Sequence, residues 1–123
     1  MAKYGNKKVF ADGLVFDSKK EAARYRELHI LHRVGEISDL RLQVPYELIP
    51  AQYETYERYG KNGKRLKDGR RCIEKAVTYI ADFVYKDDGG NTVVEDTKGV
   101  KTKDYIIKRK LMLDPYGIRI REI

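Results

Sequence analysis

Two aspartates and a lysine have the spacing best suited to chemistry in this sequence. Asp82 lies in the apolar run 79–84, and Asp96 is followed two residues later by Lys98. An aspartate within an apolar strand is unfavourable unless it is paired or coordinates a metal. The turn residues at 87–90, Asp-Asp-Gly-Gly, predict a hairpin that makes the two strands neighbours. Because like charges on paired strands destabilise a sheet, we expect Lys98 or a divalent cation to offset them.

A further carboxylate, Glu21, precedes both strands on an expected helix. Ser18 and Glu21 form the pattern of a capping box, which by itself accounts for the glutamate. Glu21, Tyr25, Leu28 and His32 also share one helical face, so the carboxylate would point toward the sheet. A role as a helix cap and a role as a metal ligand both stay open at this point.

Together these residues resemble the PD-(D/E)XK nuclease superfamily, in which an acid on one strand is followed by acid-x-Lys on the strand paired with it. Asp82 takes the first position and Asp96-Thr97-Lys98 the second, with Glu21 as the helix glutamate of many members. The sequence is also similar to a small family of phage-encoded proteins placed in that superfamily. The segments that carry this similarity are 16–21, 43–45, 79–83, 95–99 and 108–112.

The resemblance implies a metal-dependent endonuclease that hydrolyses DNA phosphodiester bonds in phage recombination, replication or genome processing. Branched DNA, such as a Holliday junction, is among the implied substrates. The implied cofactor is Mg²⁺ or Mn²⁺, since hard cations take oxygen ligands. The implied catalytic residues are Asp82, Asp96, Lys98 and Glu21, and the implied metal ligands are Asp82, Asp96, Glu21 and Thr97 through its carbonyl. Lys98 would act on the attacking water. Because Glu95 directly precedes Asp96, the pattern leaves open which of the two is the second ligand.

Positive charge is concentrated in one stretch of the chain. Lys and Arg number 26 against 19 Asp and Glu, for a net charge of +7, and the window 58–71 carries seven basic residues and one acid. Such a cluster in a basic domain is typical of nucleic-acid binding. The expected phosphate contacts are Lys61, Lys64, Arg65, Lys67, Arg70 and Arg71, with Lys108 on a later helix as a further one.

The same stretch has two simpler interpretations. The cluster could be only a solvated loop. Three tyrosines, Tyr53, Tyr56 and Tyr59, recur beside it and could stack on unpaired bases. Packing of these rings against the sheet is the simpler expectation.

The whole chain, 1–123, is expected to be a single domain of the α/β (α+β) class, with a mixed central β-sheet flanked by helices. The resemblance makes this a restriction-endonuclease-like core. Helices are expected at 19–34 and 104–113. Strands are expected as a hairpin around Asp12-Gly13 and at 43–49, 72–86, 92–98 and 118–123, with an irregular link at 37–42. A basic loop or extended hairpin is expected at about 53–71.

Composition limits the other classes. No apolar run approaches the ~20 residues of a membrane helix, and the single cysteine, Cys72, excludes an internal disulfide. We therefore expect a cytoplasmic protein of a bacterial host cell, with DNA as its partner and neither a membrane nor an organic cofactor. A homodimer stays open. The alternative function is a non-catalytic basic nucleic-acid-binding protein with the same fold.

Overall fold

The computed structural model describes residues 8–123, and the chain forms two compact units. One comprises the chain up to Pro45 and from Ile80 onward, and the other comprises Tyr46–Tyr79. The helices are α1 (Lys19–Arg33) and α2 (Lys103–Leu113). The strands are β1 (Val9–Ala11), β2 (Leu14–Phe16), β3 (Ser38–Ile49), β4 (Gln52–Tyr59), β5 (Arg65–Glu74), β6 (Val77–Lys86), β7 (Thr92–Asp96) and β8 (Arg121–Glu122).

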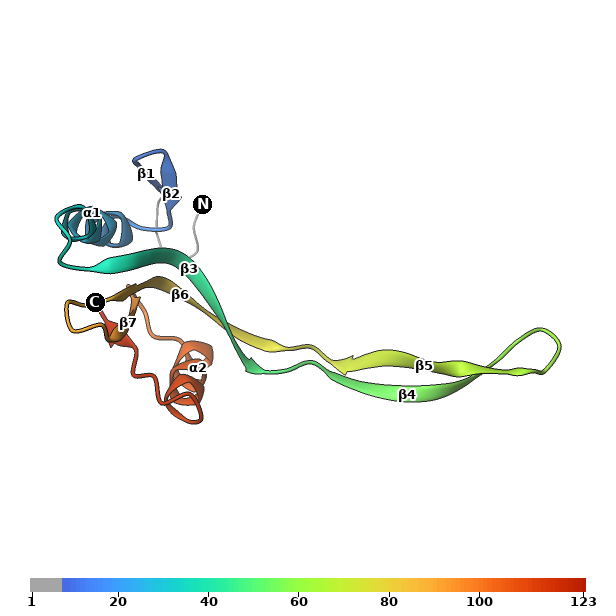
Figure 1. Cartoon of the computed structure of the whole chain (residues 1–123). Helices are drawn as coiled ribbons and strands as arrows, with labels where there is room; N and C mark the ends of the chain where they lie inside the picture. Colours follow the sequence, from blue (N-terminus) through green and yellow to red (C-terminus); the bar gives the residue numbers. More distant parts are fainter. Residues whose placement is uncertain (1–7) are drawn as a thin grey trace. The chain divides into compact units, whose positions relative to one another are not determined.

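The first unit is built around a four-stranded mixed sheet in the order β3-β6-β7-β8. Strands β6 and β7 are antiparallel and pair Phe83 with Glu95, whereas β7 and β8 are parallel and pair Asp96 with Glu122. Helices α1 and α2 lie on the two sides of this sheet (Figure 1). The mixed α+β class expected from the sequence is therefore confirmed.

Alternation along β6 and β7 gives each helix a buried surface to cover. Phe83 and Tyr85 pack with Tyr25 and Leu28 of α1 in one cluster. Phe83 and Leu28 are fully buried, and each such side chain contributes about 1.5–3 kcal/mol to folding. The intervening residues of β6 and β7 face the side of α2, whose own buried residues are Tyr105 and Met112.

The ends of α1 follow the capping signals in the sequence. Ser18 has an extended backbone, and its Oγ accepts a hydrogen bond from the Glu21 N–H at 3.1 Å. The chain leaves the helix through Gly35, whose φ of 84° is the left-handed conformation that favours glycine. These two caps fix the position of Glu21 in the first turn.

Strand β3 begins earlier than expected, because Ser38–Leu42 is strand and not an irregular link. Two residues of this strand, Asp39 and Gln43, have left-handed φ values of 54° and 52°. Pro45 lies on β3 at the edge of the sheet, where its missing N–H removes no necessary ladder bond.

Three other strand predictions were too long. The expected strand 72–86 is two strands, because β5 ends at Glu74 and β6 begins at Val77. Strand β7 ends at Asp96, since the next N–H, that of Thr97, donates to the Asp82 carboxylate instead of a strand neighbour. The expected strand 118–123 is reduced to Arg121–Glu122.

The second unit contains the antiparallel β4–β5 hairpin, which occupies the stretch expected to be a basic loop or extended hairpin. Its register pairs Tyr53 with Cys72 and Tyr56 with Gly69, with a bulge between Tyr56 and Arg58. The turn is closed by a hydrogen bond of 2.8 Å from the Gly60 N–H to the Lys64 carbonyl. Across both units, the helices within residues 8–123 are too short or too polar to cross a membrane.

Candidate active site

A cleft of about 410 Å³ in the first unit gathers residues from three separate segments. The N-terminal turn of α1 supplies Lys20 and Glu21, strand β6 supplies Asp82, and the segment after β7 supplies Thr97 and Lys98. Glu21 and Asp82, which are 61 positions apart in the sequence, therefore line the same cleft. The sequence predicted three of these five residues as catalytic and Thr97 as a ligand, whereas Lys20 was not foreseen.

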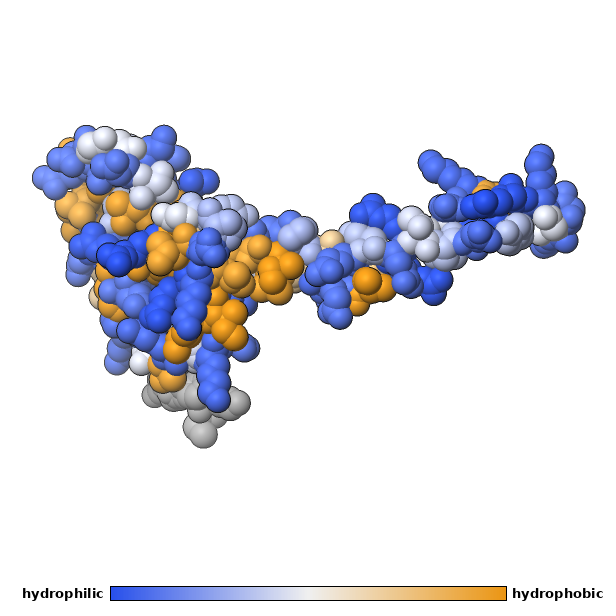
Figure 2. Space-filling view, turned by 90° about the horizontal axis from the view of Figure 1, so that it is seen from below, coloured by the Kyte–Doolittle hydropathy of each residue, from blue (hydrophilic) through white to orange (hydrophobic). Residues whose placement is uncertain are grey.

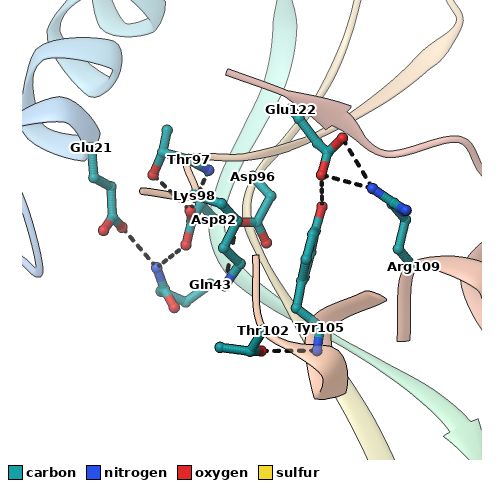
Figure 3. Close-up of polar contacts among 10 residues, drawn as sticks. All are labelled: Glu21, Gln43, Asp82, Asp96, Thr97, Lys98, Thr102, Tyr105, Arg109 and Glu122. Carbon is teal, nitrogen blue, oxygen red and sulfur yellow. Dashed lines mark hydrogen bonds and ion pairs between the residues drawn. The ribbon is translucent and has the colours of Figure 1, made fainter. Parts of the chain in front are cut away.

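Gln43 of β3 connects the two carboxylates of the cleft. Its Nε2 donates to Glu21 Oε1 at 3.0 Å and lies 3.4 Å from Asp82 Oδ1 (Figure 3). Gln43 has a left-handed backbone, with a φ of 52°, within a strand whose exposed and half-buried residues alternate. The amide thus occupies a point on which two carboxylates converge.

Asp82 is held in a fixed orientation by the residue after β7. Its Oδ2 accepts hydrogen bonds from the Thr97 N–H at 2.8 Å and from Thr97 Oγ1 at 2.9 Å. One further step in the β6–β7 register would place Asp82 opposite Asp96. The sequence left Glu95 and Asp96 both open as the neighbour of Asp82, and this register favours Asp96.

The two adjacent acids of β7 have different surroundings. Glu95 is fully buried on the side of α1, where Arg24 and the Tyr85 hydroxyl bind it. Asp96 is also fully buried, and its Oδ1 lies 3.5 Å from the Lys98 ammonium. Lys98 follows the strand and is not part of it, yet it still lies beside Asp96. This geometry favours Asp96 over Glu95 as the second acid of the site.

The ring of Tyr105, on α2, contacts the Lys98 side chain. The Lys98 ammonium lies 4.9 Å from the centre of the Tyr105 ring, close enough for a cation–π contact. The Tyr105 hydroxyl donates to Glu122 Oε2 at 2.9 Å, and Arg109 lies 3.3 Å from the same oxygen (Figure 3). Burial and the hydrogen bond to Glu122 raise the pKa of Tyr105, so its hydroxyl stays a donor. Nothing in the sequence pattern pointed to Tyr105 or Glu122.

The electrostatics of the cleft are dominated by crowded negative charge. Burial, followed by the nearby Asp82, Asp17 and Asp96 carboxylates, raises the pKa of Glu21 to about 7. The Glu21 side chain is only 4% exposed. A bound cation would relieve this repulsion, whereas without one a proton on Glu21 does so in part.

The donor atoms suit a hard divalent cation, although the site is not preassembled. Glu21 and Asp82 already direct oxygens at one electropositive group, the Gln43 amide, and oxygen is the ligand that Mg²⁺ and Mn²⁺ prefer. Within residues 8–123, however, no group of three or more His, Cys, Asp or Glu side chains is arranged to hold a metal ion. A cation would therefore compete with the Gln43 amide for these oxygens.

The remaining predicted contacts are not among the described residues that line the cleft. Lys108 is a half-buried residue of α2 and is not among the described residues that line the cleft. Lys61, Lys64, Arg65, Lys67, Arg70 and Arg71 are exposed and belong to the second unit. Gln43 is the site residue that sequence reasoning missed most clearly. Gln43 takes an ordinary exposed position in the alternating strand, directly before Val44-Pro45, so the pattern carried no signal for it.

Comparison with known proteins places the chain in one family. Residues 1–119 match the family described as protein of unknown function (DUF1064), and the chain belongs to that family. No curated protein matches the chain, and no solved structure matches it.

Proposed function

We propose that this protein is a metal-dependent endonuclease that hydrolyses DNA phosphodiester bonds with Mg²⁺ or Mn²⁺. The observation that carries the proposal is the convergence of Glu21, Asp82 and Lys98 on one cleft, with Asp96 beside Lys98. Three carboxylates and one ammonium suit phosphodiester hydrolysis, which requires both a cation and a positioned water. The resemblance to PD-(D/E)XK nucleases supports the same assignment, and we infer from it that the enzyme acts in the cytoplasm of a bacterial host cell.

Each residue has a role that follows from its contacts. Asp82, Asp96 and Glu21 would hold the cation, which would polarise the phosphodiester and offset its developing charge. The two hydrogen bonds from Thr97 keep the Asp82 carboxylate oriented toward the cleft. Lys98 carries a compact charge that can orient the attacking water or stabilise the phosphoryl oxygens.

The test is a cleavage assay on supercoiled, linear, flapped, four-way-junction and single-stranded DNA with Mg²⁺ or Mn²⁺. We expect the wild type to cleave at least one of these and Asp82→Asn to lose cleavage by ~10³-fold or more. Asp88→Asn, in the exposed β6–β7 turn, is the matched control and should cleave normally. Equal cleavage by purified Asp82→Asn would overturn the assignment.

A non-catalytic nucleic-acid-binding protein is the second candidate function. The bridging Gln43 amide favours it, because its Nε2 lies within hydrogen-bond distance of both the Glu21 and the Asp82 carboxylate without a metal. Calorimetric titration with Mn²⁺ separates the two. If the protein is a nuclease, Mn²⁺ should bind with a measurable heat that Asp82→Asn removes. If it is a non-catalytic binding protein, no heat of Mn²⁺ binding is expected.

A further inference from the structure

The β4–β5 hairpin presents two faces with different partners. Residues that pair directly share a face, and so do residues two apart on one strand. Arg70 pairs with Thr55 and therefore shares a face with Tyr53, whereas Arg71 pairs with Glu54 and shares the other face with Tyr56. The Arg70 guanidinium lies 3.7 Å from the Tyr53 ring centre, and that of Arg71 lies 4.3 Å from the Tyr56 ring centre. Each face of the ribbon therefore carries one arginine placed over a tyrosine.

Positive charge on this ribbon is concentrated toward its turn. The stretch 58–71 holds seven cations and one acid, whereas the flanking parts of the unit hold four of its five acids. Hydrophilic side chains cover the hairpin toward the turn (Figure 2). Ion pairs within residues 8–123 neutralise Arg65, by Asp68 at 2.5 Å, and Arg71, by Glu54 at 3.1 Å.

The other cations of the stretch form no ion pair with any carboxylate of residues 8–123. They are Arg58, Lys61, Lys64, Lys67 and Arg70. A solvated face stabilised by its own salt bridges would have paired them. Five uncompensated charges on a narrow ribbon indicate a polyanionic partner.

The tyrosines argue against unpaired bases as that partner. Stacking needs an open ring face, yet the Tyr53 face carries the Arg70 guanidinium. The Tyr56 ring rests on Gly69 so closely that a Cβ on that glycine would lie 2.3 Å from the ring. The Tyr59 hydroxyl is tied to Glu57 at 2.7 Å. The Tyr53 and Tyr56 rings thus each hold an arginine and stiffen the hairpin.

We propose that the β4–β5 hairpin binds double-stranded DNA by entering its major groove, with Arg70 as the side chain that reaches base edges. The major groove of B-form DNA, ~12 Å wide, admits a two-stranded β-ribbon, whereas the A-form RNA major groove is too narrow. The Tyr53 ring holds the Arg70 fork in place, and that fork matches the two acceptors of guanine. Lys61, Lys64 and Lys67 contact phosphates on either side. The inference takes DNA as the ligand from the proposed function and adds the duplex form and the groove.

Binding is measured by fluorescence anisotropy in EDTA, so that cleavage plays no part. The probes are a 24-bp DNA duplex, one of its single strands, and the RNA duplex of the same sequence. We expect the DNA duplex to bind at least tenfold more tightly than either other probe. Equal or tighter binding of the single strand would overturn the proposal in favour of base stacking.

Variants test the surface and the groove. Lys61, Lys64 and Lys67 changed together to Gln should lower the log–log salt slope by about 2.7, at about 0.9 per phosphate contact on duplex DNA. The control replaces three exposed cations of the first unit, Arg26, Arg33 and Lys86, with Gln. This control should retain most of the salt slope of the wild type. The major-groove ligand methyl green should displace the protein, and the minor-groove ligand netropsin should not. The reverse result, or an unchanged slope, would overturn the proposal.

Arg70 has its own comparison. Arg70→Ala and Arg70→Lys should both weaken duplex binding about tenfold, because a lysine cannot replace the planar fork. Tyr53→Leu should weaken it similarly, while Tyr53→Phe, which keeps the ring, should not. If duplex binding has these properties but no DNA is cleaved with any metal, the nuclease proposal fails alone. If DNA is cleaved and the hairpin variants bind normally, the hairpin proposal fails alone.

Discussion

Arg24 of α1 holds both carboxylate oxygens of Glu95, with Nε at 2.8 Å from Oε1 and Nη2 at 2.7 Å from Oε2. The two residues are 71 positions apart, and this pair fixes α1 against β7. Glu95 is fully buried, and the Tyr85 hydroxyl also donates to it. Its neighbour Asp96 points to the opposite side of the strand, beside Lys98. Adjacent acids thus serve packing on one side and the candidate site on the other.

Substituting these two acids should give opposite results. Glu95→Gln leaves the half-buried Arg24 with only the exposed Glu27 as a charged partner, and we expect a loss of about 2–4 kcal/mol in the free energy of unfolding. Asp96→Asn should cost less stability and abolish metal-dependent cleavage. Urea denaturation and cleavage assays at 15 °C, on variants whose folding is first checked by circular dichroism, measure the two effects. A larger loss of cleavage in Glu95→Gln than in Asp96→Asn would show that Glu95 is the ligand.

Stability without metal should fall as the pH rises, because of Glu21. Burial and neighbouring carboxylates raise its pKa in the folded protein to about 7, above the ordinary value of 4.5. Between those values the unfolded chain releases the proton while the folded protein keeps it, so stability decreases from pH 4.5 to pH 7 and then levels off. We expect this group to account for about 1–3 kcal/mol, measured by urea denaturation in EDTA.

Glu21→Gln is the matched control for that pH dependence. The amide keeps the size of the side chain but does not titrate, so the decrease between pH 4.5 and pH 7 should shrink by the amount that Glu21 contributes. Adding Mg²⁺ at pH 8 should stabilise the wild type and have a smaller effect on Glu21→Gln. An identical pH profile in the two proteins would contradict the assignment of the crowded charge to Glu21.

Gly69→Ala should loosen the β4–β5 hairpin. The added Cβ would lie 2.3 Å from Tyr56 Cζ, so the ring must swing away and lose Arg71. A cation–π contact at an exposed site contributes about 0.5–1 kcal/mol. We expect up to about fivefold faster amide exchange in β4 and β5, with little change in β6 and β7. In a Tyr56→Ala background the same glycine substitution should have almost no further effect. Full additivity would show that the clash does not cause the loosening.

The helices and the pairing of β6 with β7 could be predicted because their signals are local. Ser18 and Gly35 cap α1, and the turn at 87–90 sets the register that brings Asp82 toward Asp96. Strand ends were predicted less well. At Thr97 the chain leaves the sheet because its N–H binds a side chain distant in sequence, and propensity does not encode that competition.

The site could be predicted only in its acids and its lysine. Gln43 joins Glu21 to Asp82 through a left-handed backbone that no local rule assigns to glutamine. Tyr105 reaches Lys98 because α2 packs on the side of the sheet that carries Asp96, a tertiary arrangement. The Tyr105 hydroxyl bonds Glu122 and its ring contacts Lys98, and the sequence pattern indicates neither contact.

Lys98 gives the most direct distinction between an enzyme and a binding protein. Its ammonium lies 3.5 Å from Asp96 Oδ1, and its side chain is about one-third exposed at the cleft. If it acts on the attacking water or on charge developing at the phosphate, Lys98→Ala should retain DNA and Mn²⁺ binding and lose ~10²–10³-fold in turnover. Lys98→Arg should not restore the rate, because a planar fork does not replace a compact ammonium.

A purely structural role for Lys98 predicts a different set of results. Lys98→Ala would then lower the free energy of unfolding by leaving Asp96 without its cation, and Mg²⁺ would restore the fold and the activity together. Single-turnover cleavage at saturating DNA separates the two cases, because it measures chemistry apart from binding. Tyr105→Phe keeps the ring beside Lys98 and should retain most of the rate, whereas Tyr105→Leu removes the ring and should not. A Lys98→Ala protein that cleaves at the wild-type rate would leave the acids as the sole catalytic groups and remove the lysine from the mechanism.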